Sequence, residues 1–397
     1  MPKLSPEQYL EEYNFYAFRN FSKYEKKLQQ SIKIALNTPD QNTLFPTPKI
    51  SPHRQDHLAI ELGGTYLKII EFKSKKRRLK ILRQYKINFY QQIVYTPEIL
   101  FFDLKQHLDA FIPKEKRANI KFISFAFAFP LKPIWRKKQL LDGQISFLGK
   151  NLQHQDLLGL PLGSTFEEYL QANGYKNAKV SLINDSSSAL LSTLFYSKKT
   201  QNLYLNLIVG TGLNLSVGQI NKNKFRLTNL EAGNFDFLPY TIFDDLVDQT
   251  SSTHGNSLTE KMVSGAWQSQ LFKVILIDLN RRKIIDKKTM MELAFRSSAE
   301  LEKILPKYRH KFVRKIWQEI SKRAAFIAAK IISETIKLSG KKSAFLVETG
   351  GVIIGSKIFR KTLEFNLKKS LPGFPLNKIL INDTTAAGSL ILESFHH

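Results

Sequence analysis

Two short segments of this chain nearly repeat each other, and each joins an apolar strand to the start of a helix. Ile183-Asn184-Asp185-Ser186-Ser187 is echoed by Ile381-Asn382-Asp383-Thr384-Thr385. Glycine turns at strand ends also occur twice, as Gly63-Gly64-Thr65 and Gly210-Thr211-Gly212. Two copies of an α/β lobe with a cleft between them would produce this pattern. Because Asp followed by Ser or Thr also starts many helices, the echo supports a duplicated lobe without establishing it.

The rest of the chain alternates between strand-like and helix-like segments, which predicts an α/β architecture. Residues 58–62 and 67–72 flank the first glycine turn and are expected to form a hairpin. Further expected strands are 120–129, 179–183, 202–209, 213–220, 344–347 and 377–381. Expected helices are 186–197, 258–279 and 320–338, the last of which is rich in alanine and suited to packing against a sheet.

The first 57 residues are expected to form one amphipathic helix and a connector. Ser5-Pro6-Glu7-Gln8 offers an N-cap, a first-turn proline and the glutamine of a capping box, and helical spacing continues to residue 36. Residues 37–57 contain four prolines, which predicts an irregular connector. We expect this segment (1–57) to pack on a large lobe (191–383), while a small lobe (58–190) is completed by a C-terminal helix at 384–397.

The net charge of +26 is the unusual number in the composition. Seven basic residues fall within 73–83, and further clusters lie at 281–288 and 307–315. Such clusters suit nucleic acid or an anionic membrane, or they form a solvated surface. The first two clusters lack interleaved stacking aromatics and the sequence has no nucleic-acid-binding motif. We therefore expect a solvated basic surface and no nucleic acid partner.

The sequence also bounds the compartment and the class of chemistry. It contains no cysteine, which excludes disulfides, thiolate catalysis and cysteine-held metal sites. The N-terminus lacks the apolar core of a signal peptide, and the longest apolar run, residues 122–131, is too short to span a bilayer. We expect a soluble, cytoplasmic protein with no membrane span. Nothing in the sequence specifies an oligomeric state.

Any phosphate chemistry must use the glycine turns, because the sequence contains neither G-x-x-x-x-G-K-[ST] nor G-x-G-x-x-G. Glycines let backbone N–H groups converge on an anion, although a single turn of this kind is more often structural. Asp185 follows an apolar strand, where ligands collect in α/β sheets, and a carboxylate there could accept the proton of an alcohol during phosphoryl transfer. From spacing alone, capping of the helix that begins at Ser186 explains Asp185 equally well.

Seven motifs between residues 44 and 265 resemble, in order, those of the eukaryotic-type hexokinases of the actin-like ATPase superfamily. Ile60-Glu61-Leu62-Gly63-Gly64-Thr65-Tyr66 is similar to the family's L-D-L-G-G-T-N. Residues 183–186 resemble V-N-D-T, and residues 210–214 resemble G-T-G-T-N. Residues 44–47, 127–130 and 231–233 resemble M-L-P-T, F-S-F-P and E-W-G. The most specific match is 259–265, which is close to F-E-K-M-[IV]-S-G at six consecutive positions. A fainter match continues to Gly350-Gly351, which resembles the family's adenosine turn.

This resemblance implies a duplicated actin-like ATPase fold (ribonuclease H-like) with a cleft between its lobes, and ATP-dependent phosphorylation of the 6-hydroxyl of a hexose, with glucose first. It assigns the general base to Asp185. Sugar-binding residues carried over from the family are Lys150, Asn184, Asn214, Glu231 and Glu260. The ATP phosphates would meet Gly63, Gly64, Thr65, Gly210, Thr211 and Gly212, and the adenosine would meet Gly350 and Gly351. Mg²⁺ would be held through the ATP phosphates, with Glu61 acting through water rather than as a direct ligand.

The chain also departs from the family pattern at the site. Glu61 replaces an aspartate, Ala128 replaces a sugar-contacting serine, and Ser257 replaces a glutamine of the sugar pocket. Losing hydroxyl contacts should weaken discrimination among hexoses more than it removes chemistry. Two alternatives therefore stay open. The chain could be a kinase for mannose, fructose or an amino sugar, or a weakly active sugar-binding sensor protein.

Overall fold

Two units share the chain, and each gathers segments that are far apart in the sequence. Unit 1 comprises Met1–Asn37, Asn206–Leu215 and Leu230–Asn382, and unit 2 comprises Thr38–Leu205, Ser216–Asn229 and Asp383–His397. The computed structural model describes residues 4–38, 42–46, 56–64, 66–75, 78–89, 95–129, 131–137, 140–146, 152, 154–197, 203–221, 224–381 and 383–395.

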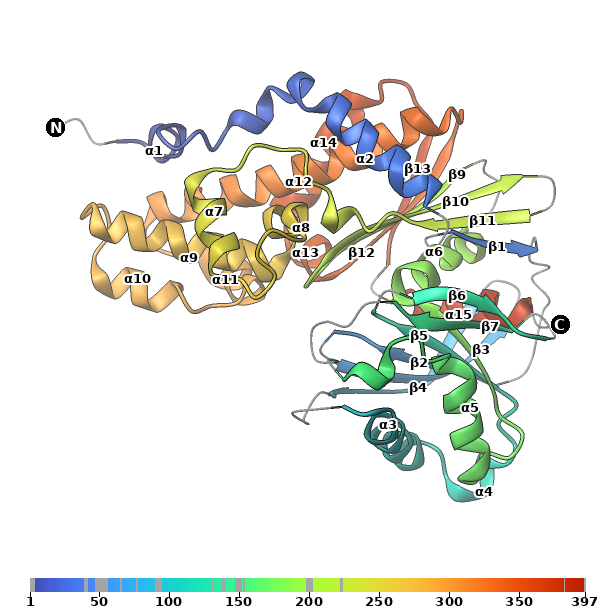
Figure 1. Ribbon diagram of the computed structural model, residues 1–397. Coiled ribbons are helices and arrows are strands. Elements are labelled where there is room, and N and C mark those ends of the chain that lie inside the picture. The colour runs from blue at the N-terminus through green and yellow to red at the C-terminus, as the bar shows by residue number, and fades with distance from the viewer. Residues whose placement is uncertain are drawn as a thin grey trace. The chain divides into compact units, whose positions relative to one another are not determined.

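A five-stranded mixed sheet forms the centre of unit 2 (Figure 1). Its strands are β2 (Asp56–Leu62), β3 (Tyr66–Lys75), β4 (Arg78–Asn88), β5 (Phe122–Phe127) and β8 (Lys179–Asn184), in the order β4-β3-β2-β5-β8. The expected hairpin is confirmed, since β2 and β3 pair antiparallel. β2, β5 and β8 are parallel neighbours, so their carboxyl ends lie at one edge of the sheet.

Helices cover both faces of this sheet. On one face, α3 (Pro97–Phe111) and α5 (Leu162–Ala172) bury Leu104 and Phe166 in one apolar cluster with Ile60 of β2. On the other face, α6 (Asp185–Tyr196) and α15 (Thr385–Ser394) pack together, and α15 contacts β2, β3 and β5. A Cβ on Gly388 of α15 would collide with the Ser188 backbone, so glycine allows this close helix contact.

Unit 2 also contains smaller elements. β6 (Leu131–Trp135) and β7 (Leu141–Ile145) form a separate hairpin, and α4 (Lys114–Arg117) and η5 (Gln155–Leu157) are short. β1 (Asn42–Pro46) pairs antiparallel with β11 (Lys224–Asn229), and β11 with β10 (Leu213–Asn221). These strands belong to a six-stranded sheet with the order β1-β11-β10-β9-β12-β13.

Unit 1 combines the remaining strands with a set of helices (Figure 1). β12 (Ala344–Thr349) pairs in parallel with β13 (Leu376–Leu380), and β9 spans Leu203–Val209. The helices are α7 (Ile242–Gln249), α8 (Leu258–Val263), α9 (Gly265–Arg281), α10 (Lys287–Leu293), α11 (Ser298–Ile304), α12 (Lys311–Ser339), α13 (Gly351–Gly355) and α14 (Lys357–Ser370), with the 3₁₀ turns η6 (Ala232–Asn234) and η7 (Leu305–Lys307). Within the described ranges, every helix is too short or too polar to cross a bilayer.

The expected continuous helix at residues 5–36 is wrong. The capping box at Ser5 and Gln8 is present, but α1 ends at Glu11, and the chain continues through η1 (Ala17–Arg19) and η2 (Phe21–Lys23) before α2 (Glu25–Asn37). The buried aromatics Phe15, Phe18 and Phe21 recur every third residue, which is the period of a 3₁₀ helix rather than an α-helix.

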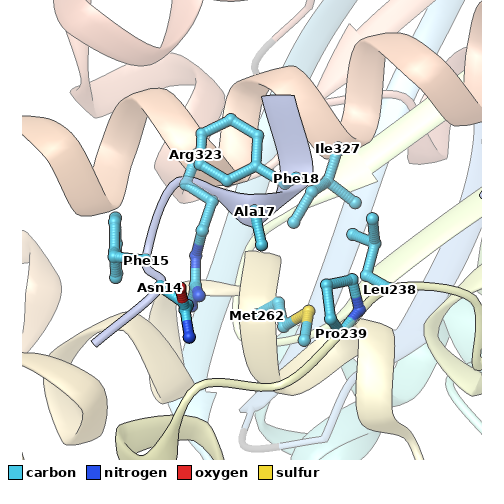
Figure 2. Close-up of a pocket in the computed structure, with 9 residues that line it drawn as sticks. All are labelled: Asn14, Phe15, Ala17, Phe18, Leu238, Pro239, Met262, Arg323 and Ile327. Atoms are coloured by element: carbon cyan, nitrogen blue, oxygen red, sulfur yellow. The ribbon is translucent and has the colours of Figure 1, made fainter. Parts of the chain in front are cut away.

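This aromatic segment packs within unit 1. Phe18 and Phe21 contact Phe326 of α12. Figure 2 shows Phe15, Ala17 and Phe18 lining a small cavity together with Met262 and with Arg323 of α12. The volume of the cavity is about 10 Å³, which is enough for a single water molecule but too small for a sugar or a nucleotide.

Three further expectations need correction. The segment 37–57 is not wholly irregular, because β1 lies within it. The helix expected at 258–279 is broken at Ser264, whose backbone is extended, because the Gly265 N–H donates to the Gly210 carbonyl (2.7 Å). The alanine-rich helix α12 packs mainly against helices, above all α14, rather than against a sheet.

Candidate functional site

The carboxyl ends of the parallel strands in unit 2 bring two expected site segments to one sheet edge. Leu62 of β2 is in register with Phe127 of β5, and Phe127 is in register with Asn184 of β8. The first glycine turn follows β2 directly, and Asp185 follows β8. The edge at which α/β sheets bind ligands therefore carries both the candidate phosphate turn and the candidate base.

Asn184, not Asp185, is the N-cap of α6. Its Oδ1 accepts hydrogen bonds from the backbone N–H groups of Ser186 (3.0 Å) and Ser187 (3.4 Å) and from Asn229 Nδ2 (3.3 Å). Its Nδ2 donates to two backbone carbonyls at the end of β5, those of Phe127 and Phe129. Both donor hydrogens of the amide are thus used within unit 2, and these contacts fix the backbone at Asp185.

Asp185 is the first residue of α6 and is half-buried. Its Oδ1 accepts the N–H of Ser186 (2.6 Å). A carboxylate in the first turn of a helix is stabilised as an anion by the helix dipole. The N-cap role belongs to Asn184, and Asp185 adds a contact to the first turn through the Ser186 N–H.

The ring of Tyr66 lies on the first glycine turn. The N–H of Gly63 donates to the carbonyl of Tyr66 (2.9 Å), which closes the turn between β2 and β3. A Cβ on Gly63 would lie 3.3 Å from Tyr66 Cζ. The Tyr66 hydroxyl donates to Glu61 Oε1 (2.8 Å). Gly64 continues the turn, and Thr65 lies outside the described residues.

A buried charge cluster lies beside this turn. Lys68 Nζ is 2.5 Å from Glu61 Oε2, 3.0 Å from Asp383 Oδ2 and 3.1 Å from Thr385 Oγ1. The Lys68 side chain is only 8% exposed. Burial by itself would lower the pKa of Lys68, but the carboxylates of Glu61 and Asp383 outweigh burial and raise it. Lys68 is therefore an ammonium that holds both acidic side chains.

The start of α15 is joined to β2 through the same cluster. The Thr385 hydroxyl donates to Glu61, and the Thr385 N–H donates to Asp383 Oδ1 (3.0 Å). The Glu61 carboxylate therefore already has three protein partners, Tyr66, Lys68 and Thr385. A water molecule that links Glu61 to Mg²⁺, as expected from the sequence, must compete with these partners.

Neither Lys68 nor Tyr66 is among the residues that the sequence predicts for the site. The sequence does hold a signal for Lys68, because it stands between the apolar residues Leu67 and Ile69 of β3, and the structure buries all three. A lysine in an inward-facing row of a strand requires a buried acidic partner. Glu61 lies directly opposite Lys68 in the β2–β3 register.

The second glycine turn, Gly210-Thr211-Gly212, joins β9 to β10 in unit 1. The Gly210 N–H donates to the Gly212 carbonyl (2.9 Å), and Thr211 is exposed. A Cβ on Gly210 would lie 3.5 Å from the backbone nitrogen of Gly351. Gly350 has φ +106° and has no room for a Cβ against Val209. The structure thus brings the expected phosphate turn against the expected adenosine turn.

Glu260 at the start of α8 lies against this second turn. Its Oε2 accepts the N–H of Leu213 (3.0 Å). A Cβ on Gly212 would lie 2.6 Å from Glu260 Oε2, and a Cβ on Gly233 would lie 3.3 Å from it. The glycines on both sides therefore leave room for the Glu260 carboxylate, which is half-buried.

Asn214 and Glu231 adjoin in the same part of unit 1, because Asn214 Oδ1 accepts the N–H of Ala232 (3.3 Å). Glu231 has φ 48°, in the left-handed region that non-glycine residues seldom adopt. Ser257 has φ 52°, and its hydroxyl donates to Asn234 Oδ1 (2.8 Å), three residues after Glu231. Such strained residues persist where the surrounding structure holds them, often at ligand sites.

The remaining candidates are Lys150 and a site for Mg²⁺. Lys150 lies outside the described residues. Among the residues that the structure describes, no group of three or more His, Asp or Glu side chains is arranged to hold a metal ion. Glu61 and Asp383 both contact the Lys68 ammonium, an arrangement that does not fit a metal held by these side chains alone. The donor set fits Mg²⁺ only when phosphate oxygens supply most of its ligands.

A larger hollow of about 340 Å³ is present in unit 1. It is lined by Val247, Thr250, Ser251, Ser252, Ala266, Trp267 and Gln270. None of these residues is among the candidates, so the site is defined by the contacts above and not by this hollow.

Comparisons with known proteins agree with this arrangement. Family models described as hexokinase match residues 17–195 and residues 204–389. The "Hexokinase-like 1 protein" of Arabidopsis thaliana is 25% identical over 242 residues, which span 56% of this chain and 48% of that protein. "Hexokinase-1" of Spinacia oleracea is 22% identical over 432 residues, which span 93% of this chain and 83% of that protein.

Solved structures give the same result for the fold. The hexokinase of Schistosoma mansoni complexed with glucose has a TM-score of 0.78 and 19% sequence identity, and the match covers 94% of this chain and 95% of that chain. The mixed α/β, actin-like fold expected from the sequence is therefore confirmed.

Proposed function

Because this chain belongs to the hexokinase family, we propose that it transfers the γ-phosphoryl group of ATP to the 6-hydroxyl of a hexose. The observation that carries the proposal is Asp185, a half-buried carboxylate at the carboxyl end of β8 whose helix is capped by its neighbour Asn184. A carboxylate held in this way can accept the proton of the attacking hydroxyl.

The roles of the other residues follow from their chemistry. Asn214, Glu231 and Glu260 offer the amide and carboxylate groups that a polyol requires as donors and acceptors. The N–H groups of Gly63 and Gly210 close the two glycine turns, so phosphate oxygens would be bound by other backbone N–H groups of these turns. Mg²⁺, carried on the ATP phosphates, would neutralise the charge that develops on the transferred group. Lys150 and Thr65 keep the sugar and phosphate roles that the resemblance gives them.

Glucose is proposed as the first substrate. The support is the Schistosoma mansoni relative, whose structure is complexed with glucose. Ala128 and Ser257 lack the side-chain groups that the family places against the sugar, so discrimination against mannose, fructose and glucosamine should be weak. A missing hydrogen bond is worth about 0.5–1.5 kcal/mol, or roughly 2- to 13-fold in kcat/KM.

A sugar panel tests this proposal. ADP release would be measured by a coupled assay with MgATP and each of glucose, mannose, fructose and glucosamine, with a sugar-free reaction as the control. We expect sugar-dependent ADP release with the highest kcat/KM for glucose. A preference for another sugar would reassign the substrate. Sugar binding in calorimetry without any ADP release would instead identify a sensor protein and refute the kinase.

A further inference from the structure

Tyr66 occupies a position at which the hexokinase motif L-D-L-G-G-T-N has asparagine. Its ring lies over the glycine turn. A Cβ on Gly63 would lie 3.3 Å from Cζ and 3.4 Å from both Cε atoms of Tyr66, so the ring covers the Cα of this glycine. A group that approaches the Cα of Gly63 from this side would therefore meet an aromatic side chain.

The ring is held in place from more than one side. Its hydroxyl donates to Glu61 Oε1 at 2.8 Å. The ammonium of Lys86, on the edge strand β4, lies 3.9 Å from the ring centroid, and that of Lys68 lies 5.9 Å from it. A hydrogen bond to a carboxylate and a cation over the ring both favour this position.

The carboxylates around the ring oppose an incoming anion. Burial raises the pKa of the Tyr66 hydroxyl, and the nearby carboxylates Glu61, Asp185 and Asp383 raise it further, so the hydroxyl stays protonated and donates. The buried Lys68, which could attract a phosphate, is already paired with Glu61 and Asp383. Phosphate binding at Gly63 would require both the ring and these pairs to rearrange.

We propose that Tyr66 is a lid on the first glycine turn, which the phosphates of the nucleotide must displace, so that this residue sets the affinity of the protein for ATP. The inference rests on the proposed function, because it takes the Gly63 turn as the phosphate site. A state that is open in about 0.1–10% of molecules lowers the apparent affinity about 10- to 1000-fold.

Direct nucleotide binding tests the lid. Calorimetry with MgATP and with MgADP would compare the wild type with Tyr66→Asn and Tyr66→Phe, and glucose binding would be measured on the same samples. Tyr66→Asn removes the ring, and we expect its dissociation constant for nucleotide to fall at least about tenfold. Tyr66→Phe keeps the ring but loses the hydrogen bond to Glu61. Its dissociation constant for nucleotide should therefore lie between those of the wild type and Tyr66→Asn. The dissociation constant for glucose should not change.

A third variant controls for loss of folding at the turn. Lys86 is exposed, so Lys86→Gln releases the outer side of the ring without altering the turn, and it should also tighten nucleotide binding. Equal nucleotide affinity in the wild type and all three variants would overturn the lid, while wild-type turnover with glucose would leave the proposed function standing. Weaker binding by Tyr66→Asn would make Tyr66 part of the nucleotide site and would also overturn the lid. Absence of nucleotide binding in every protein, together with absence of turnover, would refute both proposals.

Discussion

At the scale of single residues, the start of α6 separates two roles that the sequence leaves joined. Spacing alone allows Asp185 to be either a helix cap or a base, and the contacts give the cap to Asn184. The same contacts use both amide hydrogens of Asn184. The resemblance assigns this residue to sugar binding. Because Oδ1 already accepts from Ser186, Ser187 and Asn229, a sugar contact to Asn184 must replace one of these hydrogen bonds.

The two glutamates of unit 1 should act on sugar affinity. Glu231→Gln and Glu260→Gln each weaken an acceptor for a hydroxyl, at a cost of about 1–3 kcal/mol, which corresponds to a rise of roughly 5- to 150-fold in the KM for glucose. In Glu260→Gln, the amide oxygen of the new side chain can still accept the Leu213 N–H, so the fold should be kept. Glu168→Gln, at an exposed position of α5, is the matched control.

Steady-state kinetics with glucose as the varied substrate measures the effect, and thermal melting confirms that each variant is folded. Unchanged KM in both variants would move the sugar pocket away from Glu231 and Glu260.

At the scale of elements, the sequence predicts most strands and fewer of the helix boundaries. The β2–β3 hairpin, β8 and β12 follow from apolar runs bounded by glycine or by Asn-Asp, which are local signals. The break between α8 and α9 is not local, because it depends on the hydrogen bond from Gly265 to Gly210. The N-terminal helix fails for a related reason, since all three of its buried phenylalanines contact α12, far away in the sequence.

The candidate site also contains some features that local sequence predicts and others that depend on distant contacts. Motifs within one turn, such as Gly210-Thr211-Gly212, can be predicted because glycines between two apolar strands are a local turn signal. The contact of Lys68 with Asp383 joins residues 315 positions apart, and no local pattern encodes that distance. Tyr66 looks like an ordinary strand residue in the sequence, and only the fold brings its ring onto Gly63.

The helices of unit 1 are joined by a buried ion pair that gives a prediction for stability. Arg323 of α12 donates to both carboxylate oxygens of Asp244 of α7, at 2.9 and 2.6 Å, and the two side chains are 3% and 6% exposed. Burial would raise the pKa of Asp244, but Arg323 and the hydrogen bonds from Thr241 outweigh burial and lower it. Asp244→Asn should therefore lower the free energy of unfolding by about 3–5 kcal/mol at neutral pH.

The pH dependence has a definite sign. The folded-state pKa of Asp244 lies below its unfolded value of about 3.9, so its contribution is complete above that value and is lost as pH falls through the folded pKa. The difference in unfolding free energy between the wild type and Asp244→Asn should shrink below about pH 4. Urea unfolding at several pH values measures it. Glu12→Gln, which breaks the exposed pair with Arg282, should cost no more than about 1 kcal/mol. A similar loss in both variants would contradict the buried-pair account.

At the scale of the whole molecule, exposed basic side chains contribute to the net charge of +26. On the edge strand β4, Arg78, Lys80 and Lys86 are exposed. Among the described residues, the buried cations Lys68, Lys261 and Arg323 are each paired with carboxylates. A charged edge strand resists pairing with another sheet, which is one structural use for basic residues on β4.

The central claim is that Asp185 is the base of a sugar kinase, and the kcat of Asp185→Asn tests it most directly. The substitution keeps size and shape, so glucose binding and the melting temperature should stay close to those of the wild type. Asp156→Asn, an exposed aspartate of η5, is the matched control. The account predicts that kcat for ADP release with glucose falls by about 10²–10⁴-fold in Asp185→Asn and is unchanged in Asp156→Asn. A folded Asp185→Asn protein that retains more than about a tenth of the wild-type kcat would contradict it.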